Sequence, residues 1–272
     1  MVLIPPGEFL MGSTAEEQAR FLEEAKATED QWAIDRMPSE GPQHRVRIVR
    51  PFRLSRHEVT RGLFRQFVER TGYKTEVERD GKGGFGYVDG KWIQDPRFVW
   101  SADLGFEQTD DHPVVNVSWN DAIAFCQWLS DKEGAEFVLP SEAQWEYACR
   151  AGTTTAWYCG QSDAQLQEYA WFGVNSGGKT HPVGELLANG FGLYDMHGNV
   201  WEWCSDWYAA DYYAQSPADD PSGPSAGSHR VLRGGHWGLH AMRSRSACRC
   251  GHFPVSREGT TGFRLTSVLT DE

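Results

Sequence analysis

From Thr153 to the C-terminus, the chain carries no long segment with the periodicity of a helix or strand. Glycine, aromatic and turn-forming residues dominate this part, and residues 209–229 are so rich in Ala, Ser, Pro, Asp and Gly that they predict a long surface loop. The chain has no repeat and no alternation of strands with helices, which argues against a Rossmann fold or a β/α barrel. Its 12 Trp residues indicate a core with polar partners inside it, because each indole carries one N–H donor. We therefore expect an irregular α+β domain.

The regular elements are expected mainly before residue 153. The expected strands are residues 2–4, 8–11, 44–50 and a hairpin over 87–93 that turns at Asp89-Gly90. The expected helices are an acidic one from Thr14 to about Ile34, one capped by Thr60 and ended by Gly72, one from Asn120 to Gly134, and one capped by Ser141 and Gln144 that stops at Gly152.

Charge and composition exclude some classes of function. The formal net charge is −12, so a nucleic-acid partner is not expected, whereas acidic clusters suit calcium. No run of 18 apolar residues and no signal-peptide pattern occurs, so we expect no membrane span and a cytoplasmic protein, unless the chain is a piece of a larger one. Of the six cysteines, the four that stand far apart, Cys126, Cys149, Cys159 and Cys204, are expected to be buried free thiols.

Several sequence blocks, in order, share the pattern of one family. They are Ile4-Pro-Pro-Gly-Glu-Phe-Leu-Met-Gly12, Glu58-Val-Thr60, His112-Pro-Val-Val-Asn-Val-Ser-Trp119, Leu139-Pro-Ser-Glu-Ala-Gln-Trp-Glu-Tyr-Ala148, Gly192-Leu-Tyr-Asp-Met-His-Gly-Asn-Val-Trp-Glu-Trp203, Arg233-Gly-Gly235 and Gly262-Phe-Arg-Leu265. This chain resembles the formylglycine-generating enzyme, or sulfatase-modifying factor, family over almost its whole length. The resemblance implies a single domain over 1–272 with an irregular α+β variant of the C-type lectin fold.

The family's enzymes use two cysteines after the Arg-Gly-Gly motif to hold copper(I), a soft ion that thiolates suit. Here the first cysteine position is Leu239, and the second falls within residues 241–244, which contain no cysteine. We therefore expect neither formylglycine generation nor a copper or iron cofactor. One alternative is an improvised metal site of Cys248 and Cys250 with His236, His240 and His252, since Cys and His are legitimate ligands.

The resemblance also implies a structural calcium site. The family's motif supplies a side-chain oxygen, two backbone carbonyls and a Glu, which correspond to Asp195, Gly198, Val200 and Glu202. Alternatively, Asp195 and Glu202 pair with Arg233 or Arg264, because buried carboxylates need a partner. A second calcium site of the family is in doubt because Trp171 follows Tyr169-Ala170, where the family has Asn.

Residues 236–261 alternate between two kinds of position. The frame that resembles the family is Trp237, Arg245, Ser246, Ala247, Arg249, Pro254 and Arg257, followed by Gly262-Phe263-Arg264. The interleaved residues, which share no polarity or period, are His236, Gly238, Leu239, His240, Arg243, Ser244, Cys248, Cys250, Gly251, His252, Phe253, Val255, Ser256, Thr260 and Thr261.

This alternation of frame and interleaved positions resembles the variable region of diversity-generating retroelement proteins. In those proteins, adenine-specific mutagenesis turns AAC codons into NNC codons. NNC triplets cannot encode Lys, Gln, Glu, Met or Trp, and all the interleaved residues comply, whereas Met242 and Glu258 do not. Ordinary drift in a surface loop is the competing explanation. We expect the frame to be buried and the interleaved side chains to face solvent.

The resulting hypothesis is a non-catalytic, lectin-fold binding protein that contacts a protein or other macromolecular ligand through residues 236–261. Two alternatives stay open: a metal-dependent oxidase or oxygenase of the wider family, and a pseudo-enzyme that regulates a true family enzyme. Whether the protein is an enzyme is therefore not decided by the sequence.

Overall fold

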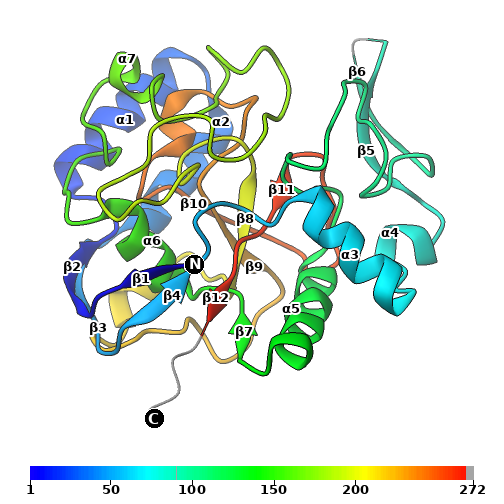
Figure 1. Ribbon diagram of the computed structural model, residues 1–272. Helices are drawn as coiled ribbons and strands as arrows, with labels where there is room; N and C mark the ends of the chain where they lie inside the picture. The colour runs from blue at the N-terminus through cyan, green and yellow to red at the C-terminus, as the bar shows by residue number, and fades with distance from the viewer. Residues whose placement is uncertain (90, 268–272) are drawn as a thin grey trace.

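The computed structural model describes residues 1–89 and 91–267. Two four-stranded sheets form its centre (Figure 1). The first sheet has the order β10 (Arg249–His252), β9 (Arg230–Arg233), β8 (Trp201–Trp207) and β11 (Thr261–Gly262). The second has the order β1 (Val2–Ile4), β4 (Phe52–Leu54), β12 (Thr266–Ser267) and β7 (Phe137–Val138). Only β11 and β8 pair in parallel; the other pairs of these two sheets are antiparallel.

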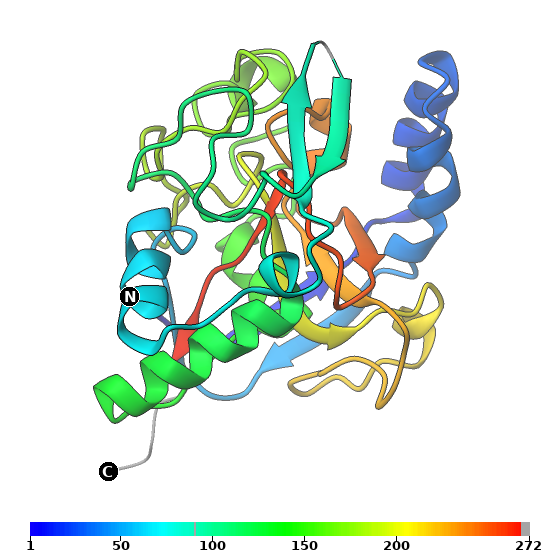
Figure 2. The ribbon, with the colours of Figure 1, turned by 90° about the vertical axis from the view of Figure 1, so that its right-hand side faces the viewer.

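Two antiparallel pairs and several short helices surround these sheets. The pairs are β2 (Gly7–Met11) with β3 (His44–Ile48), and β5 (Gly84–Val88) with β6 (Lys91–Asp95). The α-helices are α1 (Ala15–Ala27), α2 (Gln31–Arg36), α3 (Arg61–Thr71), α4 (Glu76–Arg79), α5 (Trp119–Glu133), α6 (Glu142–Arg150) and α7 (Asp163–Leu166). The 3-10 helices are η1 (Met37–Glu40), η2 (Tyr212–Gln215) and η3 (Ala241–Ser244). Helices α1 and α2 lie on the side of the molecule opposite α3 and α5 (Figure 2).

Most expected elements form, and the differences have local causes. The acidic helix is broken in two, because Glu29 adopts a left-handed backbone and Asp30 then caps α2 through the Ala33 N–H. Helix α5 begins at Trp119 rather than Asn120, since Ser118 and Asp121 form a capping box. The capping box of Ser141 and Gln144 is confirmed. The hairpin turn expected at Asp89-Gly90 lies partly outside the described residues, because Gly90 is not among them.

The irregular second half is confirmed, and polar groups do run through its core. Residues 209–229 contain only the short helix η2 as a regular element. Trp145, Trp157 and Trp203 are fully buried, and each indole N–H donates a hydrogen bond. Across the described residues, no helix is long and apolar enough to cross a membrane. All six cysteines are free thiols, with Cys159 half-buried and the other five, Cys248 and Cys250 included, buried.

Candidate ligand-binding site

Four buried arginines anchor the chain on either side of, and within, residues 236–261. Each pairs with a buried glutamate: Arg233 with Glu146, Arg245 with Glu40, Arg249 with Glu142 and Arg264 with Glu202. Burial opposes their charge, but the paired carboxylates raise the pKa of all four guanidinium groups above the usual value. Such pairs fix geometry, because breaking one leaves an uncompensated buried charge.

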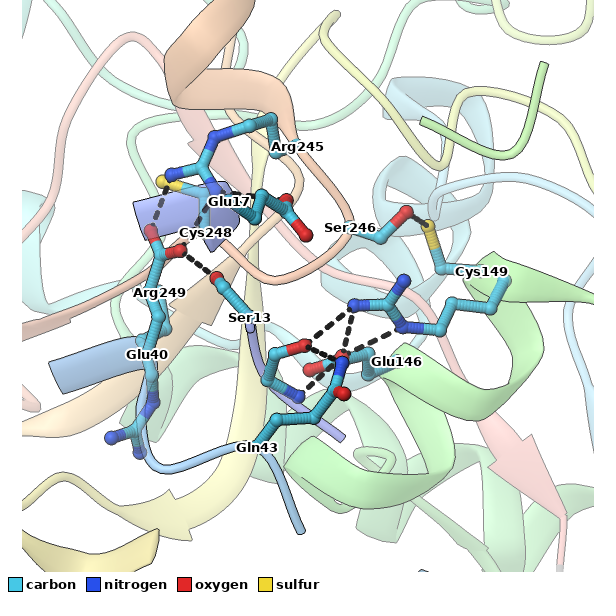
Figure 3. Close-up of polar contacts among 12 residues, drawn as sticks. Ser13, Glu17, Glu40, Gln43, Glu146, Cys149, Arg245, Ser246, Cys248 and Arg249 are labelled. Atoms are coloured by element: carbon cyan, nitrogen blue, oxygen red, sulfur yellow. Dashed lines mark hydrogen bonds and ion pairs between the residues drawn. The ribbon is translucent and has the colours of Figure 1, made fainter. Parts of the chain in front are cut away.

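Arg245 links the segment to the N-terminal part of the chain (Figure 3). Its guanidinium donates to both carboxylate oxygens of Glu40, at 2.8 and 2.6 Å, and to Glu17 at 3.3 Å. The Ser13 hydroxyl donates to the same Glu40 carboxylate. Nearby, Ser246 lies against the buried thiol of Cys149, at 3.8 Å. The expectation that the frame is buried is confirmed for Arg245 and its neighbours, while Pro254 and Arg257 are half-buried.

A cavity of about 250 Å³ opens beside this frame. Its lining residues are Trp32, Trp201, His236, Leu239, Arg243, Cys250, His252, Glu258, Thr260 and Thr261. Seven of these ten belong to the interleaved set, all except Trp32, Trp201 and Glu258. The structure therefore brings about half of the interleaved residues together around one hollow.

The interleaved residues do not all face solvent as expected. The exposed ones are Gly238, His240, Phe253 and Val255. The half-buried ones are His236, Leu239, Arg243, Gly251, His252, Ser256 and Thr260. The buried ones, for which the expectation is wrong, are Ser244, Cys248, Cys250 and Thr261.

Packing explains the buried positions. Ser244 packs closely against Gly235. A Cβ added at Gly235 would lie 2.3 Å from the Ser244 Oγ. Cys248 and Cys250 belong to the main hydrophobic cluster, and Cys250 pairs with Leu232 across β10 and β9. Thr261 lies on β11, opposite Trp201 of β8. At these four buried positions, the close packing of the surrounding residues accounts for the small side chains.

Helix α2 supplies part of the cavity wall through Trp32, which the sequence did not reveal. Arg243 makes a two-pronged ion pair with Asp30, and its guanidinium lies 4.6 Å from the centre of the Trp32 ring. His240 lies 3.6 Å from Glu24. A tryptophan within an otherwise acidic helix is the signal that could have pointed to this wall.

The alternative metal site of cysteines and histidines does not assemble. Within residues 1–89 and 91–267, no three His, Cys, Asp or Glu side chains are placed to hold a metal ion together. Burial raises the pKa of Cys248 to about 12 and that of Cys250 further, so both thiols stay protonated at neutral pH. Enclosure, with the nearby Arg243, lowers the pKa of His236 to about 3.

The positions of the family's copper ligands carry no thiol. Leu239 is half-buried and lines the cavity. Residues 241–244 form η3, where Ala241, Met242 and Ser244 are buried. None of these side chains can act as the thiolate that copper(I) chemistry needs.

The expected calcium motif forms a buried acidic cluster. Both oxygens of Glu202 accept hydrogen bonds of 2.6 Å from Arg264, and Oε2 also accepts one from the Trp145 indole. Glu202 therefore pairs with Arg264, which is one of the two arginine pairings expected as the alternative to calcium. Arg233 pairs with Glu146 instead. Asp195 accepts a hydrogen bond from the backbone N–H of Gly184, at 2.7 Å.

Glu58 adds a third carboxylate to this cluster. Its Oε1 accepts a hydrogen bond from Asn199, but its buried Oε2 has no partner. Burial and the neighbouring carboxylates raise the pKa of Glu58, and burial raises that of Asp195 to about 6. Three carboxylates thus face one guanidinium, Arg264. This excess of negative charge favours a cation, but in the described residues the three carboxylates are not placed to hold a metal ion together, and Glu202 would have to share its oxygens with Arg264.

The sequence and the fold can now be compared with known proteins. A family model described as "Sulfatase-modifying factor enzyme 1-like domain" matches residues 1–268. The chain belongs to the sulfatase-modifying factor family. Its irregular α+β structure is the C-type lectin-like fold that the resemblance implied.

Proteins that the chain resembles differ in what they are named for. It is 35% identical to the formylglycine-generating enzyme of Streptomyces coelicolor, over 98% of this chain and 88% of that protein. It is similar to the structure of PvdO from Pseudomonas aeruginosa, with a TM-score of 0.78, 30% identity, and coverage of 98% and 93%. It is also similar to Treponema denticola variable protein 1, with a TM-score of 0.72, 28% identity, and coverage of 98% and 94%.

Proposed function

We propose that this protein is a non-catalytic binding member of the sulfatase-modifying factor family, with its ligand site at the cavity and its rim. The observation that carries the proposal is the lining of that cavity. Leu239 stands where the family's enzymes have a copper-binding cysteine, and seven interleaved residues surround the hollow. A leucine at this position cannot perform the copper chemistry of the family's enzymes, and the residues around it form a hollow that suits a bound ligand.

The buried frame suits a binding site whose side chains vary. Arg245, Arg249 and Arg264 hold the backbone through ion pairs that the cavity-lining residues do not share. A rigid backbone lowers the entropic cost of ordering a site when a ligand binds. Substitution at a position such as Leu239 or His252 would then change the ligand without disturbing the fold.

The rim favours a macromolecular partner. Phe253 and Val255 are exposed hydrophobic residues beside the cavity segment, 54% and 50% accessible, and His240 is exposed as well. Exposed aromatic and apolar side chains next to a hollow are typical of protein interfaces, where a few such residues dominate the binding energy. The partner that we propose is therefore a protein surface larger than the cavity itself.

Diversification by a retroelement is the finer part of the proposal. It is supported by the separation of frame from interleaved positions and by the similarity to a Treponema denticola variable protein. The interleaved residues comply with NNC codons, while the non-compliant Met242 is buried and Glu258 is fixed in sequence by the same rule.

The DNA that flanks the coding region tests this function. We expect a nearby, near-identical copy of the segment that encodes residues 236–261, with adenines at the codons of the interleaved positions. The frame codons of Trp237, Arg245 and Arg249 are the internal control and should match the copy without such differences. A locus with no such copy would contradict retroelement diversification.

The competing function, a metal-dependent oxidase, makes a different prediction. It requires a redox metal that purifies with the protein and is lost together with activity on chelation. Copper or iron at one equivalent per chain, by elemental analysis, would favour it over the binding function.

A structural calcium ion at Asp195 and Glu202 also stays a prediction. It is supported by the charge excess of the acidic cluster and by the partnerless Oε2 of Glu58. Such an ion would hold β8 against the loop that carries Asp195, and it takes no part in the proposed binding.

A further inference from the structure

Glu258 is a half-buried carboxylate in the cavity with no partner of its own. No side chain or backbone donor among the described residues forms a hydrogen bond or ion pair with it. Its neighbour Arg257 is already bound to Asp80 and to the Val255 carbonyl. The cavity's other cation, Arg243, is neutralised by Asp30.

The remaining groups do not cancel this negative charge. His236 accepts a hydrogen bond from the Gly238 N–H through Nδ1, and its lowered pKa keeps it neutral. The pKa of His252 is also lowered, by burial. The cavity therefore holds one carboxyl group without an ion-pair partner, which is only partly ionised at neutral pH because burial raises its pKa to about 7. Its charged form is costly until a counter-ion joins it.

Two tryptophans line the same cavity as this carboxylate. The rings of Trp32 and Trp201 lie 6.1 Å apart, tilted by 43°. Arg36 and Arg243 already lie over the Trp32 ring, at 4.7 and 4.6 Å. No guanidinium or ammonium of the described chain lies over Trp201. An indole face and a carboxylate together attract a cation, by its charge and by the ring's quadrupole.

These three residues are also the constant part of the cavity. Trp32 and Trp201 lie outside residues 236–261, and Glu258 is a residue that NNC codons cannot encode. The other seven lining residues are interleaved. If the proposed function holds, the varied side chains surround an anchor that stays the same in every variant, so the anchor recognises a group that all its ligands share.

We propose that the cavity binds one positively charged side chain, a lysine or arginine of a protein partner, with Glu258 as its counter-ion. A volume of about 250 Å³ admits a single side chain rather than a folded surface. The net charge of −12 attracts basic segments over longer distances. Burial raises the pKa of Glu258 to about 7, and a bound cation would favour its ionised form.

The test compares two short peptides that differ only in charge. Acetyl-Gly-Arg-Gly-amide carries a guanidinium, and acetyl-Gly-citrulline-Gly-amide carries a neutral urea of nearly the same shape. Calorimetric titration should detect binding of the arginine peptide and at least tenfold weaker binding of the citrulline peptide. Glu258→Gln, which keeps the shape of the side chain, should remove this preference, whereas Glu136→Gln, an exposed site on the loop before β7, should not.

Three results would overturn the proposal: equal affinity for both peptides, no binding of either, or a preference that survives in Glu258→Gln. The wild-type comparison stands even if the variant folds poorly. The flanking DNA tests retroelement diversification separately. A template copy without charge preference would leave diversification intact and reject the cation, while charge preference without a template would reject diversification and keep the cation.

Discussion

Removal of Arg245 should cost the protein much of its stability. Arg245→Ala removes a fully buried guanidinium that binds both oxygens of Glu40, the Met242 carbonyl and Glu17. Glu40, itself buried, would keep only the Ser13 hydroxyl as a hydrogen-bond donor to its side chain. The substitution therefore leaves an uncompensated buried carboxylate.

The expected loss follows from that orphaned charge. Removal of one partner from a buried ion pair costs about 3–5 kcal/mol. For a chain of this size, each 1 kcal/mol lowers Tm by roughly 2–4 °C, so the expected fall is roughly 6–20 °C. Val255→Ala is the control, because Val255 lies in the same segment but is half exposed, and it should cost less than about 0.5 kcal/mol.

Thermal unfolding followed by circular dichroism measures both variants. The double variant Arg245→Met, Glu40→Leu separates charge from packing. If the orphaned carboxylate causes the loss, the double variant should recover most of it, because an apolar pair of similar volume replaces a buried ion pair at little cost. A fall of less than about 2 °C for Arg245→Ala, or a double variant as unstable as the single one, would refute this reasoning.

Four further outcomes follow from the structure. If calcium binds at Asp195 and Glu202, chelation should lower Tm, and elemental analysis should find the metal; an unchanged melting curve with no calcium would exclude it. A cysteine-containing sulfatase peptide incubated with copper and reductant should stay unconverted by mass spectrometry, and a mass loss for thiol-to-aldehyde conversion would contradict this. Phe253→Ala should leave Tm nearly unchanged but weaken partner binding, whereas a clear fall in Tm would place that side chain in the core. Burial, with the neighbouring Glu142, raises the pKa of Asp206 to about 7, so the stability it contributes is complete below its unfolded pKa and is lost as pH rises from there through 7; Asp206→Asn should flatten the fall in Tm between about pH 4 and pH 7, and an unchanged slope would argue against this origin.

The sequence predicts what is local and misses what depends on distant contacts. The capping box of Ser141 and Gln144 needs only residues one turn apart, so it could be read directly. The frame arginines could be recognised by family pattern, but their partners could not. Glu40 lies 205 residues from Arg245, and spacing along the chain says nothing about that pairing.

The candidate site was predicted in part for the same reason. Exposure of Phe253 and Val255 was expected and is found, whereas Cys248 and Cys250 are buried by a strand pairing that composition does not reveal. Trp32 and Glu258 complete the cavity, yet no motif marks either one. Both come into place only when the N-terminal helices fold against the C-terminal segment.

If the cavity is diversified as we propose, the ion pair between Arg243 and Asp30 would keep its positions from varying independently. Asp30 binds Arg243 and, through the same carboxylate, caps helix α2, which carries Trp32. Exchange of Arg243 for a neutral residue would free Asp30 and loosen the first turn of that helix. One changed codon would then move a wall that it does not encode, so the effect of any second substitution would depend on the residue at position 243. The collection of sites that this scaffold can display is therefore shaped by epistasis and is smaller than the number of sequences it can carry.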